Sequence, residues 1–81
     1  MSARYLLRTD EVRDHLDRQH WSHKRVARHL GISPGYWSQL LNRRRPLSPD
    51  MRVLLLQSRL FPGMPEEAIW ERVEDDPGGA P

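Results

Sequence analysis

The chain has 81 residues, no cysteine and a formal net charge of +2 at pH 7. This length suffices for one small domain, and the lack of cysteine excludes a disulfide framework and a cysteine-based zinc site. No apolar run approaches the roughly 20 residues that a membrane-spanning helix needs, and the first ten residues lack the apolar stretch of a signal peptide. We therefore expect a soluble, cytoplasmic single-domain protein without a cofactor.

The charge is unevenly distributed along the chain. Residues 1–65 carry twelve basic and five acidic side chains, whereas residues 66–81 carry six acidic side chains and one arginine. A basic body with an acidic end indicates a polyanionic partner for the body. All basic residues except Lys24 are arginine, which suits bidentate contacts with phosphate and guanine, although a GC-rich genome would favour arginine codons equally well.

Apolar residues recur at helical spacing along the chain, and no segment alternates with the period of a strand. The predicted fold class is therefore all-α, with four to five helices in a compact domain. Residues 1–8 are expected to form a basic arm. Thr9 is expected to cap a first helix that ends near His20, with Val12 and Leu16 on its buried face.

A second helix is predicted to begin after Ser22, whose hydroxyl is a good N-cap. Val26, Ala27 and Leu30 would then share one buried face. Gly31 follows directly, at the place where a residue with positive φ commonly ends a helix.

A third helix is predicted after Ser33, with Pro34 at its first position, where the missing N–H is no loss. Pro46 ends the arginine cluster that follows this helix. The apolar residues of the predicted buried face are Tyr36, Trp37, Leu40 and Leu41.

Ser48 is expected to cap a fourth helix, in which the four apolar residues 53–56 cover more than one side. Such a helix lies at the centre of a core or is shared with a partner. Pro62 and Gly63 break the chain, and residues 62–74 are predicted to hold a short C-terminal helix, a possible dimerisation element. Residues 75–81 are expected to be a disordered acidic and Gly-Pro tail.

The second and third predicted helices are separated by about three residues with glycine at the junction, which is the layout of a helix-turn-helix. Ala27 is small enough to lie where the two helices approach most closely, and Gly31 permits the left-handed turn. Ile32, Trp37 and Leu40 would hold the third helix against the core. Its outer face would then be free to enter a DNA major groove.

Residues 23–42 resemble the helix-turn-helix of the lambda repressor/Cro-like (Xre-type) family. The resemblance extends over roughly residues 9–61, and the chain departs from the pattern at Arg43, where the family commonly has glycine. The positions that agree with the family pattern are Val26, Ala27, Leu30, Gly31, Ile32, Trp37 and Leu40.

The resemblance implies a sequence-specific transcriptional regulator, such as a repressor, that binds double-stranded DNA, usually as a homodimer. By position, Pro34 and Gly35 would also face the bases, but neither has a side-chain donor. Gln39 can pair bidentately with adenine. The side chains expected to read bases are those of Ser33, Ser38, Gln39 and Asn42.

Residues on both sides of the third helix are expected to contact phosphates, because arginine and helix N-termini favour anions. These residues are Ser22, His23, Lys24, Tyr36, Arg43, Arg44 and Arg45. In a dimer, two recognition helices would lie about 34 Å apart, which is one turn of DNA. The dimer-interface candidates are Leu56, Leu60, Ile69, Trp70 and Val73.

Simpler interpretations compete with several of these predictions. Trp37 would stack on bases if it were exposed, but its spacing favours the core; the arginine cluster by itself is an ordinary charged loop. The four histidines show no zinc-ligand spacing, and nothing resembles a catalytic pair, so neither a metal site nor an enzyme is expected. The alternative function is a protein-interaction module, either antitoxin-like or an adaptor for the transcription machinery, which the poor base-reading chemistry of Pro34 and Gly35 favours.

Overall fold

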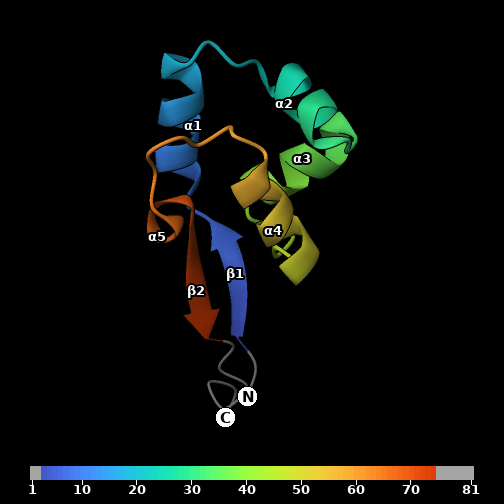
Figure 1. The fold of residues 1–81 in the computed structure, drawn as a ribbon. Helices are drawn as coiled ribbons and strands as arrows, with labels where there is room; N and C mark the ends of the chain where they lie inside the picture. The colour runs from blue at the N-terminus through green and yellow to red at the C-terminus, as the bar shows by residue number, and fades with distance from the viewer. Residues whose placement is uncertain (1–2, 75–81) are drawn as a thin grey trace.

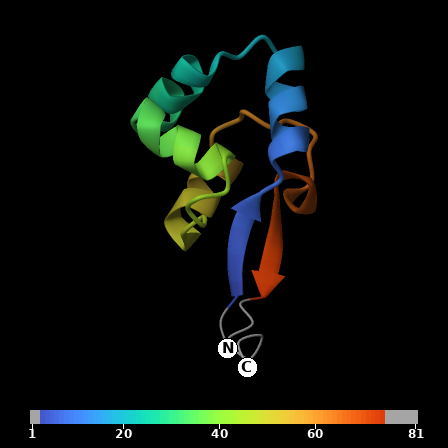
Figure 2. The same ribbon diagram turned by 180° about the vertical axis from the view of Figure 1, so that it is seen from behind.

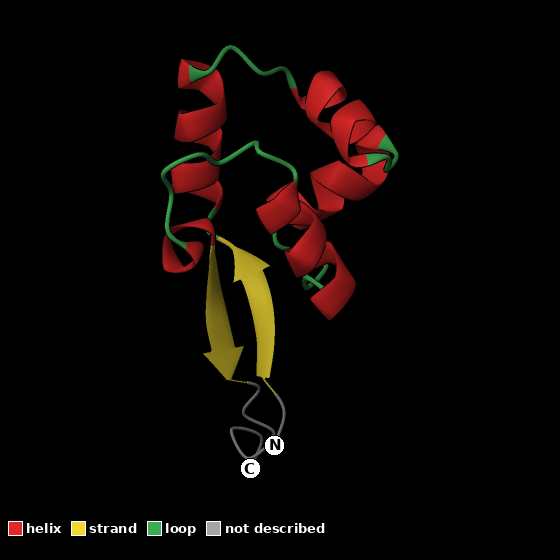
Figure 3. Ribbon diagram, in the orientation of Figure 1, coloured by secondary structure: helices red, strands yellow, loops and turns green. Residues whose placement is uncertain are grey.

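The computed structural model describes residues 3–74, which form five helices and two strands (Figures 1 and 3). The helices lie together at one end of the molecule, and the two strands extend away from them as a narrow ribbon (Figures 1 and 2). The predicted tail at 75–81 lies outside the described residues. The elements in chain order are β1 (Ala3–Leu7), α1 (Thr9–Arg18), α2 (His23–Leu30), α3 (Pro34–Leu41), α4 (Pro49–Gln57), α5 (Glu66–Ile69) and β2 (Trp70–Glu74).

The predicted all-α fold class is wrong, because the two ends of the described chain pair as an antiparallel sheet. Ala3 lies opposite Glu74, and Leu7 lies opposite Trp70. The segment 3–7, expected to belong to a basic arm, is therefore β1. The C-terminal helix is confined to the four residues of α5, since Trp70 already has extended backbone angles (φ −144°, ψ 164°).

A two-stranded sheet is only marginally stable alone, so packing against the helices must hold this one. Leu6 and Leu7 of β1 and Trp70 of β2 are buried. A hydrogen bond also joins β1 to the loop before α4. The backbone N–H of Leu47 donates to the carbonyl of Tyr5 at 2.8 Å. The guanidinium of Arg52 lies 3.9 Å from the centre of the Tyr5 ring, a cation–π contact on the same strand.

The predicted starts of three helices are confirmed by their caps. The hydroxyl oxygens of Ser22, Ser33 and Ser48 each accept a hydrogen bond from the backbone N–H three residues later, at 3.0–3.2 Å. Proline occupies the first turn of α3, as predicted, and also the first turn of α4. Gly31 ends α2 with φ +74°, in the left-handed conformation that a residue with a Cβ rarely adopts.

Thr9 has a different role from the predicted one. It is the first residue of α1 rather than its N-cap, which is Arg8 without a side-chain cap. The Thr9 hydroxyl instead donates to the carbonyl oxygen of Leu41 at 2.6 Å. This bond joins the start of α1 to the last turn of α3, where carbonyl groups lack partners within the helix.

One hydrophobic core joins the helices to the base of the sheet, and it contains the predicted inner residues of the first three helices except Tyr36. Tyr36 is only partly buried and packs against this core. In α4 only Met51 and Leu55 are buried, whereas Val53 and Leu56 are 50% and 51% exposed. The four consecutive apolar residues of α4 thus serve the core on one side and face solvent on the other. The fully buried large side chains are Leu7, Val12, Leu16, Val26, Trp37, Leu40, Leu55, Leu60 and Ile69.

Candidate nucleic-acid interface

Helices α2 and α3 pack against each other across a three-residue turn, the arrangement of a helix-turn-helix (Figure 1). Beyond Gly31, the N–H of Ile32 bonds to the carbonyl of Ala27 at 3.0 Å, which closes the end of α2. Ala27 is completely buried in the same cluster as Trp37 and Leu40. A larger side chain at residue 27 would therefore force α3 outward.

The inner face of α3 fixes its orientation. Trp37, Leu40 and Leu41 are at most 3% exposed. The indole Nε1–H of Trp37 donates to Nδ1 of His23 at 3.3 Å, so the core tryptophan is also bonded to the first residue of α2. Because Nδ1 of His23 accepts this bond, a neutral His23 ring carries its proton on Nε2. The expectation that Trp37 packs in the core is confirmed.

The outer face of α3 is accessible, as predicted, and its side chains are small or polar. Ser33, Pro34, Gly35, Ser38, Gln39 and Asn42 are all exposed.

The four polar side chains of this face all have partners within the protein. The Ser33 oxygen caps the helix through the Tyr36 N–H, at 3.0 Å. The amide nitrogen of Asn42 donates to the Ser38 hydroxyl at 3.2 Å. The Gln39 side-chain oxygen accepts from Nε of Arg45 at 2.9 Å. Ser38 and Asn42 therefore form one polar pair on this face, and Gln39 and Arg45 form another.

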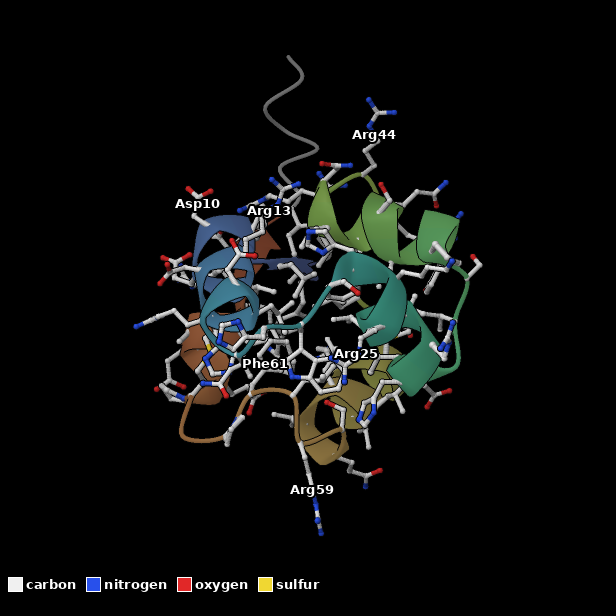
Figure 4. The ribbon with its side chains drawn as sticks, turned by 90° about the horizontal axis from the view of Figure 1, so that it is seen from above. Asp10, Arg13, Arg25, Arg44, Arg59 and Phe61 are labelled. Atoms are coloured by element: carbon white, nitrogen blue, oxygen red, sulfur yellow. The ribbon has the colours of Figure 1, made fainter. Side chains whose placement is uncertain are left out.

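The three consecutive arginines after α3 have different surroundings. Arg43 pairs with Glu71 of β2 at 2.6 Å, and Arg8 reaches the other carboxylate oxygen of the same glutamate at 4.0 Å. Arg44 is exposed and points away from the helices (Figure 4). Arg45 returns to α3, where its guanidinium lies 5.3 Å from the centre of the Tyr36 ring. Of the three, Arg44 is the best placed for a phosphate, whereas Arg43 faces the sheet.

Sequence reasoning missed Glu71, which joins the arginine cluster to β2. No sequence pattern indicated this contact, because Glu71 lies 28 positions after Arg43 and in a segment that was predicted to be a helix. Its carboxylate offsets part of the charge beside the end of α3.

Arg43 ends α3 with φ +60°, a conformation that costs a residue with a Cβ roughly 1–2 kcal/mol. The N–H of Arg43 bonds to the Leu40 carbonyl at 3.2 Å, and that of Arg44 to the Gln39 carbonyl at 2.9 Å, which is a Schellman turn. The position where the lambda repressor/Cro-like pattern commonly has glycine thus has a glycine-like backbone here.

We expect Arg43→Gly to be more stable than Arg43→Ala by about 1 kcal/mol, because both lose the Glu71 ion pair and only glycine relieves the strain. Urea denaturation followed by circular dichroism measures this difference. An alanine variant as stable as the glycine variant would contradict the left-handed end of α3.

Of the remaining predicted phosphate contacts, Tyr36 lies on α3 beneath the Arg45 guanidinium, and the others lie at the start of α2. Ser22 uses its hydroxyl as the helix cap, and His23 and Lys24 are exposed. Arg25, one turn further, covers the ring of the half-buried Trp21 at 4.7 Å. The N-terminal amides of α2, together with Lys24 and Arg25, form a positive edge beside α3.

The structure divides the predicted dimer-interface residues. Leu60, Ile69 and Trp70 are at most 3% exposed and belong to the core of a single chain, so they are not available to a second one. Leu56 is half-exposed and Val73 is partly buried. A mainly apolar hollow lies beside Leu56, and Arg59 is among the residues that line it.

Two of the histidines support the turn after α4. Nε2 of His15 is 2.9 Å from the Leu60 carbonyl oxygen, and Nε2 of His29 is 2.7 Å from that of Ser58. His15 is buried, at 9% exposed. Within residues 3–74, no group of three or more potential ligands is arranged to hold a metal ion.

No helix within the described part of the chain is long and apolar enough to cross a membrane. No protein-family model matches the chain, and no similar curated protein or solved structure was found.

Proposed function

We propose that this protein binds double-stranded DNA with sequence preference, inserts α3 into the major groove and regulates transcription from that site. The observation that carries the proposal is the division of α3 into two faces. One face is anchored by Trp37, Leu40 and Leu41, which are at most 3% exposed, and the opposite face carries only small or polar groups. The agreement of residues 26–40 with the lambda repressor/Cro-like pattern supports the same function. Its cellular location would then be the cytoplasm, on the nucleoid.

The charges around α3 support this docking. Arg44 follows its C-terminus, and the amides of α2 with His23 and Lys24 lie at the other side. Both groups favour phosphate, so they would hold the two backbone strands that border a groove. Gly35 faces open space, and a DNA backbone or base edge can approach α3 closely there.

Selection of bound sites from random DNA, followed by fluorescence anisotropy, tests the proposal. We expect the selected duplex to bind more tightly than a scrambled one by about tenfold or more at every salt concentration. Equal affinity for both duplexes would remove sequence preference, and no binding to either would remove DNA binding altogether.

Arg44→Ala is expected to weaken binding to the selected and scrambled duplexes by the same factor. Loss of the Arg44 side chain should also reduce the magnitude of the slope of log K (the binding constant) against log salt concentration by about one, because one phosphate contact is lost. Arg59→Ala is the matched control, since Arg59 points to the opposite side of the molecule (Figure 4). Equal losses in the two variants would contradict a local contact by Arg44.

The alternative function, a protein-interaction module, is favoured by the exposed apolar side of α4. Val53 and Leu56 are half-exposed beside the apolar hollow, which suits a protein surface better than DNA. Leu56→Asn would abolish binding to a protein partner and leave DNA binding intact. A homodimer through the same side of α4 is also a proposal, which light scattering with and without the selected duplex tests.

A further inference from the structure

We propose that Arg45 reads a guanine in the major groove and that Gln39 is the residue that positions it. This inference rests on the proposed DNA-binding function and changes the role of Gln39, which the sequence predicted as a reader of adenine. The contact that carries it is the 2.9 Å hydrogen bond from Nε of Arg45 to the side-chain oxygen of Gln39.

Two side chains of α3 hold the Arg45 guanidinium. Tyr36 and Gln39 are three residues apart and therefore neighbours on one flank of the helix. The ring of Tyr36 lies 5.3 Å from the guanidinium carbon, and Gln39 fixes its Nε–H. Because Gln39 is on the exposed face, the guanidinium of Arg45 lies along the face that would enter the groove. The return of the chain after α3, through the left-handed Arg43, makes this contact possible.

The hydrogen-bonding groups of this pair match one base. Nε of Arg45 is used internally, which leaves the N–H groups of its two terminal nitrogens as donors. The Gln39 oxygen is engaged, so this amide presents mainly its NH₂ group. The pair thus offers donors, and guanine presents two acceptors in the major groove, O6 and N7. Adenine presents one acceptor and one donor, and cytosine presents a donor, so both fit less well.

Holding the guanidinium in advance also lowers the cost of binding. A free arginine side chain loses rotamer entropy when it is fixed in a complex. Arg44 is exposed and points away from the helices, an arrangement suited to a phosphate, whose position varies little with sequence (Figure 4). Adjacent arginines would thus have separate tasks, with Arg44 supplying affinity and Arg45 supplying sequence preference.

The test compares sites selected from random DNA by the wild-type protein, Arg45→Ala and Arg45→Lys. We expect a guanine at one position of the wild-type site, preferred over adenine by roughly 5- to 150-fold, which is 1–3 kcal/mol at 1.4 kcal/mol per tenfold. Both variants should lose this preference. Arg45→Lys should keep the wild-type affinity for scrambled DNA, because it keeps the charge but not the paired donors.

Gln39 variants separate positioning from direct reading. Gln39→Glu should retain the guanine preference, since a carboxylate also accepts from Nε of Arg45. Gln39→Ala should reduce the preference without changing which base is preferred. If Gln39 itself read adenine, both Gln39 variants would lose an adenine preference that Arg45→Ala retains, and this result would overturn the inference.

The remaining outcomes distinguish the inference from the function it rests on. A uniform loss of affinity in Arg45→Ala, with the selected site unchanged, would make Arg45 a phosphate contact and leave DNA binding standing. A wild-type protein that binds no duplex would overturn both. Circular dichroism spectra and urea midpoints equal to those of the wild type show that the variants compared are folded.

Discussion

Trp37→Ala is expected to remove a large share of the protein's free energy of unfolding at 25 °C. Trp37 is 1% exposed and bonds to His23, and removal of such an aromatic side chain typically costs about 3–5 kcal/mol. The total stability of a chain of this length is of order 4–12 kcal/mol, so the loss is a large share of it. Urea denaturation followed by far-ultraviolet circular dichroism measures the loss.

Trp37→Phe is the matched control, because phenylalanine keeps most of the apolar volume and loses the N–H. We expect it to fold cooperatively, with a stability between those of the wild type and Trp37→Ala. A Trp37→Ala protein that is within 1 kcal/mol of the wild type but binds DNA poorly would place Trp37 on the outer face. The outward orientation of Gln39 would then be lost as well.

Trp70→Ala is expected to cost a similar amount, about 3–5 kcal/mol, because Trp70 is 3% exposed at the point where β2 meets the helices. Amide hydrogen exchange should become faster along β1, whose Leu7 lies opposite Trp70. The free energy of unfolding from urea titration gives the size of the effect.

Trp21→Ala provides the comparison for this second tryptophan. Trp21 is only half-buried and contacts Arg25 and His29, so its removal should cost clearly less than that of Trp70. Equal costs for the two variants, with unchanged exchange in β1, would argue that residues 70–74 do not form the strand described here.

The local features of the helices could be predicted because the side chains that define them act within a few residues. A serine cap accepts from the backbone N–H three positions later. The left-handed conformation of Gly31 likewise depends on the residue itself and not on distant contacts. The division of α3 into inner and outer faces followed from the spacing of Trp37 and Leu40. These features were predicted from the sequence, and they are the ones that position the candidate interface.

The sheet could not be predicted in the same way, because its two strands are separated by the whole helical region. No turn signal joins β1 to β2, and each strand is only five residues long. Ile69 and Val73 are four residues apart, which fits a helix. Leu6 and Leu7 are adjacent and both buried, which breaks the alternation expected of a strand.

The Arg45–Gln39 contact was also beyond sequence reasoning. Six positions separate the two residues, and they meet only because Arg43 reverses the chain in a conformation normally reserved for glycine. From the sequence, both residues were predicted to contact DNA, but Gln39 was predicted to contact a base and Arg45 a phosphate.

The pairing of residues 3–7 with residues 70–74 also has a consequence for how the polypeptide reaches its native state. Contacts between α2 and α3 join near neighbours in the chain, whereas the pair Leu7–Trp70 closes a loop that contains nearly every other element. Loop-closure entropy opposes that step until the helices have shortened the distance between the ends. The sheet of β1 and β2 should therefore form last in folding, after the helices have packed together.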